Sequence, residues 1–156
     1  ANNITLDNAA NDFTGAVTLT GNNVALRDAN ALTLGAVTAP GSFTLTAGGT
    51  ITANGAVSTG LFDLKGGNWQ QVNATLPTFS AADFRLSGGS FLRALGGTGV
   101  SGDSYQITDV YGLQGLGWSA RDAEAACDNV AHLVDETPDI GVAQLLRAAL
   151  NSLARR

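Results

Sequence analysis

The chain has 156 residues and a formal net charge of −5 at pH 7, a length that fits one ordinary domain with or without an appendage. Only 13% of its residues are charged, about half the usual quarter. A hydrophobic content of 44% excludes a disordered acidic segment. The acidic balance argues against nucleic acid as a partner. No apolar run approaches the roughly 18 residues of a membrane-spanning helix, so we expect no membrane insertion.

The cysteine content and the first residues indicate which covalent links and which processing to expect. Cys127 is the single cysteine, so we expect neither an internal disulfide nor a multi-cysteine metal site. The sequence opens directly in polar, strand-like residues without a signal-peptide pattern, and we therefore expect a mature or excised fragment. The 20 glycines suit short strands joined by tight turns.

Residues 1–118 contain an internal repeat. The triplet Gly-Ala-Val begins at Gly15, Gly35 and Gly55, with a spacing of 20 residues each time. A second series, opened by Ile4-Thr-Leu6, recurs every 19 to 22 residues from Val24 onward. Its members are Val24-Ala-Leu26, Phe43-Thr-Leu45, Phe62-Asp-Leu64 and Phe84-Arg-Leu86. Interleaved series that share one period indicate a repeat architecture.

The repeat predicts an all-β fold, a parallel β-helix (β-solenoid) of about five coils of 19–20 residues. Each apolar-polar-apolar triplet is a short strand whose two apolar side chains face inward, and equivalent strands stack in columns. The outward positions Ala25, Thr44, Asp63 and Arg85 stack as well, which places opposite charges of Asp63 and Arg85 on adjacent rungs. A β-sandwich is the weaker alternative, because it needs no residue-level repeat.

Three segments carry a family resemblance: residues 11–20, 28–35 and 46–55. They resemble the shaft repeats of filamentous-haemagglutinin-like adhesins, which Gram-negative bacteria secrete by the two-partner route. The resemblance implies a right-handed parallel β-helix, a shaft without catalytic residues, and a location outside the bacterium or on its cell surface. Residues 96–107 followed by 109–116 resemble the GLUG motif of bacterial surface proteins.

Residues 70–118 interrupt the regular coils of residues 1–69. We expect a loop or shifted strand at 70–82, a Gly-rich surface loop at 94–104, and strand at 105–107 and 110–111. This part holds most of the aromatic residues, namely Trp69, Phe79, Phe91, Tyr105, Tyr111 and Trp118. We favour a core plug at the end of the rod. The alternative is an exposed glycan-binding surface formed by Trp69, Tyr105, Tyr111 and Trp118.

Residues 119–156 predict a helical tail of two helices. Ser119 is the expected N-cap of the first helix, and Thr137 with Pro138 ends it and begins the second. We expect the two apolar faces to pack on each other and on the last coil of the rod, and the alternative is that they dock on another subunit. The residues assigned to this cap or assembly role are Val130, Leu133, Val134, Leu145, Leu146, Leu150 and Leu153.

The sequence contains few candidate catalytic or metal-binding residues. Cys127 and His132 lie about 140° apart on one helix, so they do not form a nucleophile pair. One His and one Cys are too few for a metal site, and we expect no cofactor. The carboxylates of Asp28, Asp63 and Asp83 are scattered along the chain, which makes a polysaccharide-cleaving enzyme the least favoured alternative.

The function expected from the sequence is that of a structural or adhesive module. We expect a non-catalytic stiff rod that self-assembles end to end, and its expected partners are another copy of itself or a host glycan or receptor.

Overall fold

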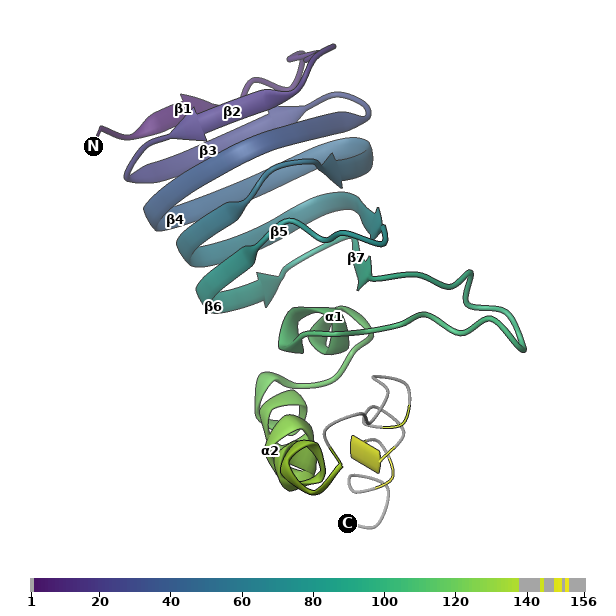
Figure 1. The fold of residues 1–156 in the computed structure, drawn as a ribbon. Coiled ribbons are helices and arrows are strands. Elements are labelled where there is room, and N and C mark those ends of the chain that lie inside the picture. The colour runs from purple at the N-terminus through teal and green to yellow at the C-terminus, as the bar shows by residue number, and fades with distance from the viewer. Residues whose placement is uncertain (1, 138–143, 145–147, 150, 152–156) are drawn as a thin grey trace. The chain divides into compact units, whose positions relative to one another are not determined.

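The computed structural model describes residues 2–137, 144, 148, 149 and 151. The chain forms two compact units. The first unit comprises Ala1–Gln71 and Thr75–Leu92, and the second comprises Val72–Ala74 and Arg93–Arg156. The wound strands form the first unit, and the helices belong to the second (Figure 1). The boundary between the units lies near residue 92, well before the expected change from strand to helix at 118.

The first unit is a parallel β-helix, as the repeat predicts. Its strands are β1 (Ile4–Leu6), β2 (Val17–Thr20), β3 (Asn23–Asp28), β4 (Leu32–Ala53), β5 (Val57–Val72), β6 (Phe79–Leu86) and β7 (Ser90–Ala94). The order β1-β3-β4-β5-β6 stacks five successive turns, while β2 pairs with β4 and β7 with β5. The pairs β1–β3, β2–β4, β3–β4, β4–β5 and β5–β6 are all parallel. Within β4 and β5 the register shifts between straight stretches, which is where the backbone turns a corner.

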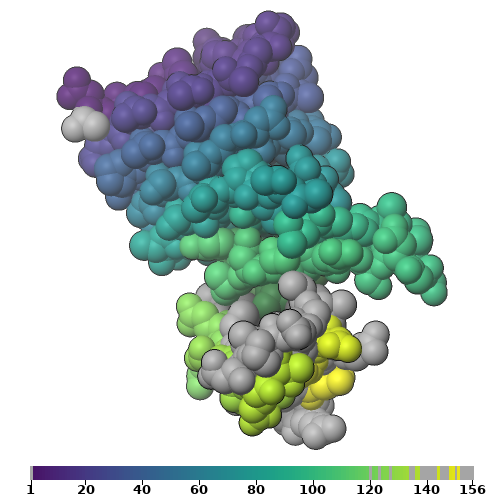
Figure 2. All heavy atoms as spheres, in the orientation of Figure 1, coloured from purple at the N-terminus to yellow at the C-terminus, as the bar shows by residue number. Residues whose placement is uncertain are grey.

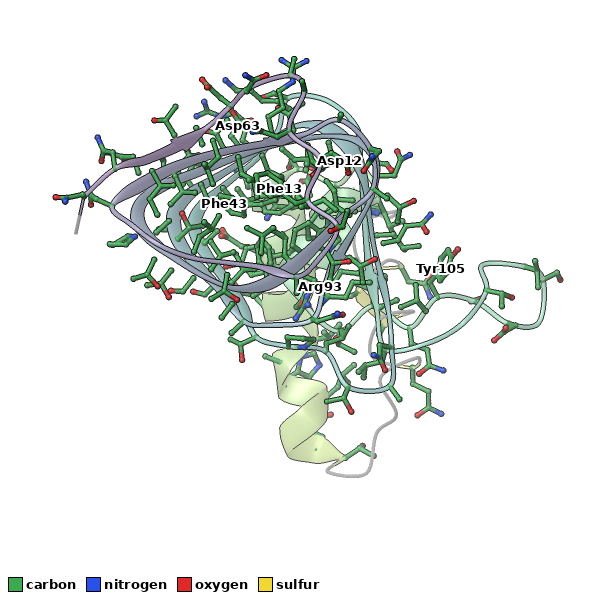
Figure 3. The ribbon with its side chains drawn as sticks, turned by 90° about the horizontal axis from the view of Figure 1, so that it is seen from above. Asp12, Phe13, Phe43, Asp63, Arg93 and Tyr105 are labelled. Atoms are coloured by element: carbon green, nitrogen blue, oxygen red, sulfur yellow. The ribbon has the colours of Figure 1, made fainter. Side chains whose placement is uncertain are left out.

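The inward columns have the predicted register. Val24, Phe43, Phe62 and Phe84 are paired in succession, and Leu26, Leu45, Leu64 and Leu86 form the column beside them. The ring of Phe43 lies inside the wound backbone when the unit is seen from above (Figure 3). Phe43, Phe62, Leu45 and Leu64 are all fully buried. Each of these four residues is therefore covered by its counterparts in the turns on either side.

Phe62 is the centre of the aromatic core. Its ring centroid lies 5.9 Å from that of Phe43, 5.5 Å from Phe84 and 5.1 Å from Phe79. Trp69 stacks on Phe91 with a centroid distance of 5.1 Å, and its side chain is 0% exposed. Trp69, Phe79 and Phe91 thus form part of the core, as the plug interpretation predicts. The alternative assignment of Trp69 to an exposed glycan-binding surface is wrong, because its position pairs with the inward Ile51 of the preceding turn.

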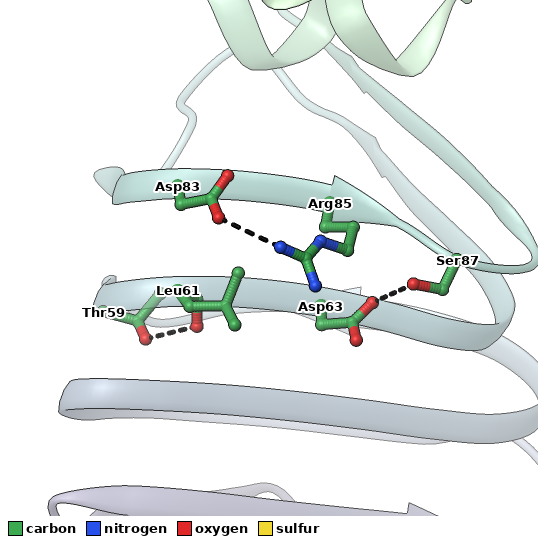
Figure 4. Close-up of polar contacts among 6 residues, drawn as sticks. All are labelled: Thr59, Leu61, Asp63, Asp83, Arg85 and Ser87. Atoms are coloured by element: carbon green, nitrogen blue, oxygen red, sulfur yellow. Dashed lines mark hydrogen bonds and ion pairs between the residues drawn. The ribbon is translucent and has the colours of Figure 1, made fainter.

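The outward column has the predicted register but a different ion pair. Thr44 pairs with Asp63, and Asp63 with Arg85. Arg85, however, forms its described ion pair with Asp83 at 3.3 Å, while Asp63 accepts a 2.5 Å hydrogen bond from the hydroxyl of Ser87 (Figure 4). Asp83 and Arg85 stand two residues apart on one strand, so both side chains project from the same face.

A buried carboxylate joins the first turn to the second. Asp28 is 1% exposed, and its two oxygens accept hydrogen bonds from the backbone amides of Phe13 at 2.8 Å and Asn30 at 2.9 Å. In this first turn Val17 pairs with Leu34, and Leu19 takes the place opposite Val37. The first Gly-Ala-Val triplet is therefore out of register with the other two.

Close approach of neighbouring turns explains part of the glycine content. Gly89 has a φ of 77°, and a Cβ there would collide with the carbonyl oxygen of Gly67 in the preceding turn. Only glycine fits such a corner without moving the backbone. On the face shown in Figure 2, side chains of successive turns lie directly against one another.

Two helices are described in the second unit, α1 (Val110–Gly115) and α2 (Ala120–Glu136). The expected strand at 110–111 is wrong, because these residues begin α1, and residues 105–107 lie in no described strand. The expected loop at 94–104 is present after β7 ends at Ala94. Ser119 is the N-cap of α2, and the helix ends before Thr137, both as predicted.

We predict that Phe62→Ala lowers the free energy of unfolding of the β-helix by about 3–5 kcal/mol, since it leaves a cavity between five aromatic rings. The matched control is Thr38→Ala, whose side chain is exposed and should cost less than about 1 kcal/mol. Urea denaturation followed by circular dichroism measures both values. Equal losses in the two variants would contradict the stacked core.

Candidate interaction surface

An ion pair organises the start of the helical unit. The guanidinium Nε of Arg93, at the end of β7, donates to the Oδ2 of Asp109 at 2.6 Å, and the Arg93 side chain is only 6% exposed. The other carboxylate oxygen of Asp109 accepts from the backbone amide of Gly112 at 2.8 Å, so Asp109 is also the N-cap of α1. One carboxylate therefore both starts the helix and ties it to a residue 16 positions earlier.

The turn between α1 and α2 has the geometry of a Schellman motif. The amide of Gly117 donates to the carbonyl of Gln114 at 2.9 Å, and the amide of Trp118 donates to that of Leu113 at 3.3 Å. Gly117 has a φ of 94°, which favours glycine. The next residue, Ser119, accepts from the amide of Asp122 at 3.1 Å and so begins α2. The helix ends between residues 109 and 122 are therefore defined by capping interactions between residues close in the sequence.

Two apolar clusters hold the helices. The first consists of the buried Ala94, Ile107 and Leu113, against which Tyr105, Val110 and Trp118 pack. The second consists of the buried Ala126, Val130 and Ala149, with Leu133 and Ala148 packed against it. Because Ala148 and Ala149 are helical, α2 packs on a helical segment near residue 148. This contact agrees with the prediction that the apolar faces of the tail pack on each other.

The remaining predicted binding residues belong mainly to these clusters. Tyr105, Tyr111 and Trp118 are half-buried, and Tyr105 and Trp118 pack against the first cluster. The ring of Tyr105 also lies over Gly99, where a Cβ would come within 2.5 Å of it. These aromatic residues are not gathered on one open face with Trp69, which belongs to the solenoid core.

The residues assigned to the cap or assembly role are only partly described. Val130 is buried and Leu133 half-buried, both in the second cluster. The Val134 side chain and the residues Leu145, Leu146, Leu150 and Leu153 lie outside what the structure describes, as does Pro138, the expected first residue of the second helix. That the tail covers the end of the rod stays a prediction.

The side chains considered as catalytic or metal-binding residues lie apart from one another. His132 is exposed on α2, and the side chain of Cys127 lies outside the described part. Asp28 and Asp63 are buried and hydrogen-bonded, whereas Asp83 is exposed and paired with Arg85. Among the described residues, no group of three or more His, Cys, Asp or Glu side chains is arranged to hold a metal ion. Within the same residues, no helix has the length and apolar character needed to cross a bilayer.

An exposed apolar residue marks the surface of the helical unit. Leu116 is 52% exposed at the end of α1, directly before the Schellman glycine. Val100 is 59% exposed in the loop between β7 and α1. This loop is a hairpin-like excursion, in which Leu95 and Gln106 are joined by a backbone hydrogen bond of 2.8 Å and Thr98 and Asp103 by one of 3.0 Å.

Sequence comparisons match the two ends of the chain to different families. Residues 1–20 and 21–75 match a family described as repeats of unknown function (DUF5649). Residues 110–154 match the family described as the C-terminal domain of RuvA. The second match begins at the first residue of α1 and includes all of α2. It also covers residues 110–116, the last part of the segments that resemble the GLUG motif.

Two curated relatives match part of the chain. The chain is 54% identical over 44 residues to the Holliday junction branch migration complex subunit RuvA of Cutibacterium acnes. It is 59% identical over 46 residues to the subunit of the same name from Thermobifida fusca. These stretches cover 28% and 30% of this chain, and the chain spans 22% of the length of each relative. No solved structure matches the chain at a significant level.

We predict that Asp109→Ala destabilises the helical unit by about 2–4 kcal/mol, because it removes the α1 N-cap and a partner of the buried Arg93. Asp109→Asn retains an acceptor oxygen for the Gly112 amide and should lose about half as much. The helical circular dichroism during urea unfolding measures these changes, with the exposed Asp128→Ala as the control. An Asp109→Ala variant as stable as that control would contradict the dual role of Asp109.

Proposed function

We propose that the chain is a non-catalytic structural module whose β-helix serves as a stiff spacer, in the manner of the filamentous-haemagglutinin-like adhesins that its repeats resemble. The observation that carries this proposal is the unbroken register of the inward columns through β3, β4, β5 and β6. Because each turn is covered by its neighbours, bending the unit would separate close-packed apolar side chains. A location at the bacterial surface belongs to the same proposal.

The polar groups of the β-helix support a structural role. The carboxylates of Asp28 and Asp63 accept hydrogen bonds that join segments 15 and 24 residues apart. Asp83 is paired with Arg85 on the same strand. A polysaccharide-cleaving site would need carboxylates free to act on a substrate, and these three are committed to contacts within the protein.

Mechanical unfolding tests the spacer function. With the chain held at Asn2 and Leu92, we expect the β-helix to resist extension and then to unfold cooperatively, because every turn depends on its neighbours. Phe62→Ala should lower the unfolding force, whereas the exposed Thr38→Ala should leave it unchanged. Extension at low force without a cooperative event would reject the spacer. Specific glycan binding that Tyr111→Ala abolishes would favour the adhesin alternative.

A second candidate function concerns residues 110–154, and the identity of 54% to the Cutibacterium acnes RuvA subunit favours it. We propose that this helical unit is a protein-docking module, through which the rod joins an assembly of several subunits. Its helices pack on two apolar clusters and are capped by nearby residues, so the unit can hold its own surface in place. The net charge of −5 favours a protein over DNA as the direct partner.

Direct binding to the other purified subunits of the Cutibacterium acnes branch migration complex tests the docking module. We expect Leu116→Asp to weaken this binding at least about tenfold, which corresponds to about 1.4 kcal/mol. Val100→Asp is the matched control, since Val100 is similarly exposed but lies outside the matched segment. Absence of binding by the unaltered chain, or equal weakening by both variants, would contradict the proposal.

A further inference from the structure

The connection between β4 and β5 carries an Asn-Gly pair. Asn54 and Gly55 lie between the end of β4 and the start of β5, outside the paired strands. They form the single Asn-Gly pair of the chain. Of the three Gly-Ala-Val triplets, only the third follows an asparagine, since Thr14 and Leu34 precede the other two. The pair is therefore a property of this corner and not of the repeat as a whole.

The fold requires the glycine of this pair. A Cβ at position 55 would collide with the backbone nitrogen of Ala36 and with the carbonyl group of Gly35 in the preceding turn. Only glycine allows so close an approach without moving the backbone. Glycine also leaves the nitrogen of its own peptide bond without a neighbouring Cβ, so the side chain of the preceding residue can reach that nitrogen.

The two groups that face each other across this peptide bond are uncommitted. The side chain of Asn54 is exposed. Among the residues that the structure describes, no hydrogen bond involves the carboxamide of Asn54 or the backbone amide of Gly55. The backbone on either side is bonded, because the amide of Asn54 donates to the carbonyl of Leu34 at 2.8 Å and the carbonyl of Ala56 accepts from the amide of Val37 at 2.9 Å.

Asn30 shows the opposite arrangement at another exposed position. Its Nδ2 donates to the Oδ1 of Asp12 at 3.1 Å, and its backbone amide donates to the Oδ1 of Asp28 at 2.9 Å. The residue that follows it is Ala31, which has a Cβ. The carboxamide of Asn30 would have to give up its hydrogen bond to approach the next amide, so Asn30 is an internal reference for Asn54.

We propose that Asn54 is a site of spontaneous covalent modification, at which the backbone nitrogen of Gly55 attacks the side-chain Cγ of Asn54. A bond forms between these two atoms and the bond from Cγ to Nδ2 breaks. The amide proton of Gly55 leaves with the side-chain nitrogen as ammonia, and a succinimide ring remains. Water then opens the ring at either carbonyl, which gives aspartate or isoaspartate. This inference is independent of the proposed spacer and docking functions.

The isoaspartate product lengthens the backbone at this corner by one methylene group. Gly55 lies directly against the backbone of the preceding turn, so the added atom displaces one turn relative to the other. The pairing of Val37 with Val57 begins two residues later and is weakened by this displacement. We therefore expect the modified chain to unfold at a lower urea concentration than the unmodified chain.

Peptide mass spectrometry over a time course of incubation tests the modification. We expect the amide of Asn54 to become an acid at least about tenfold faster than that of Asn30 in the same molecules. Labelling with a protein isoaspartate methyltransferase identifies the isoaspartate product. An Asn54 that stays intact, or that reacts no faster than Asn30, would overturn the proposal.

The chain unfolded in guanidinium chloride shows whether the folded corner permits the reaction. In the unfolded chain the Asn-Gly pair has no contacts that restrain it. We expect the rate at Asn54 in the folded protein to lie within about tenfold of the unfolded rate. A slower reaction in the folded protein would show that the corner protects Asn54, and would overturn the proposal.

Two variants separate the ring closure from its product. Asn54→Gln keeps a carboxamide on a longer side chain, which would have to close a larger ring, and we expect no conversion. Conversion of this variant at the rate of Asn54 would overturn the ring mechanism. Freshly prepared Asn54→Asp carries the charge of the product on an unaltered backbone, and we expect it to keep the urea midpoint of the original protein. An isoaspartate-containing protein with that same midpoint would contradict the expected displacement of the turns.

Discussion

The parallel backbone ladder between successive turns is the interaction on which the rest of the structure depends. It sets the spacing of the turns and forces equivalent side chains into columns, so that Phe62 meets Phe43 on one side and Phe84 on the other. Neither a single turn nor a pair of turns encloses such a side chain. The low charge of the solenoid follows from the same geometry, because like charges in one outward column would stand about 4.8 Å apart.

Two carboxylates of the solenoid support this stacking. Asp28 accepts hydrogen bonds from the amides of Phe13 and Asn30, and Asp63 accepts one from the hydroxyl of Ser87, so that each carboxylate adds a side-chain link between successive turns of the solenoid. Asp109 plays the equivalent part in the helical unit, where it joins α1 to Arg93. A chain that uses its carboxylates in this way is suited to hold a shape and to present surfaces, which is the role that we propose.

The columns were predictable because a residue-level repeat reports directly on register. The burial of Trp69 was predictable as well, since it follows Ile51 by 18 residues, close to one period. Helix α1 was not predictable by the same means. It has six residues, two of them glycine, and glycine disfavours helix interiors. Its formation depends on Arg93, 16 residues before Asp109, and a contact of that range leaves no periodic signal. Ser119 was identified correctly because an N-cap is a local signal.

The repeated contacts also restrict how such a chain can change in length. Each inner turn meets its neighbours through nearly the same columns, so the gain or loss of one whole turn would leave every other contact intact and alter the rod by about 4.8 Å. An insertion of one residue within a strand would instead turn the apolar side chains that follow it to the outside, as far as the next corner. The longer connection between β5 and β6, at residues 73–78, is such a corner. Variation among related chains is therefore expected in whole turns and at corners, with the straight segments constant in length.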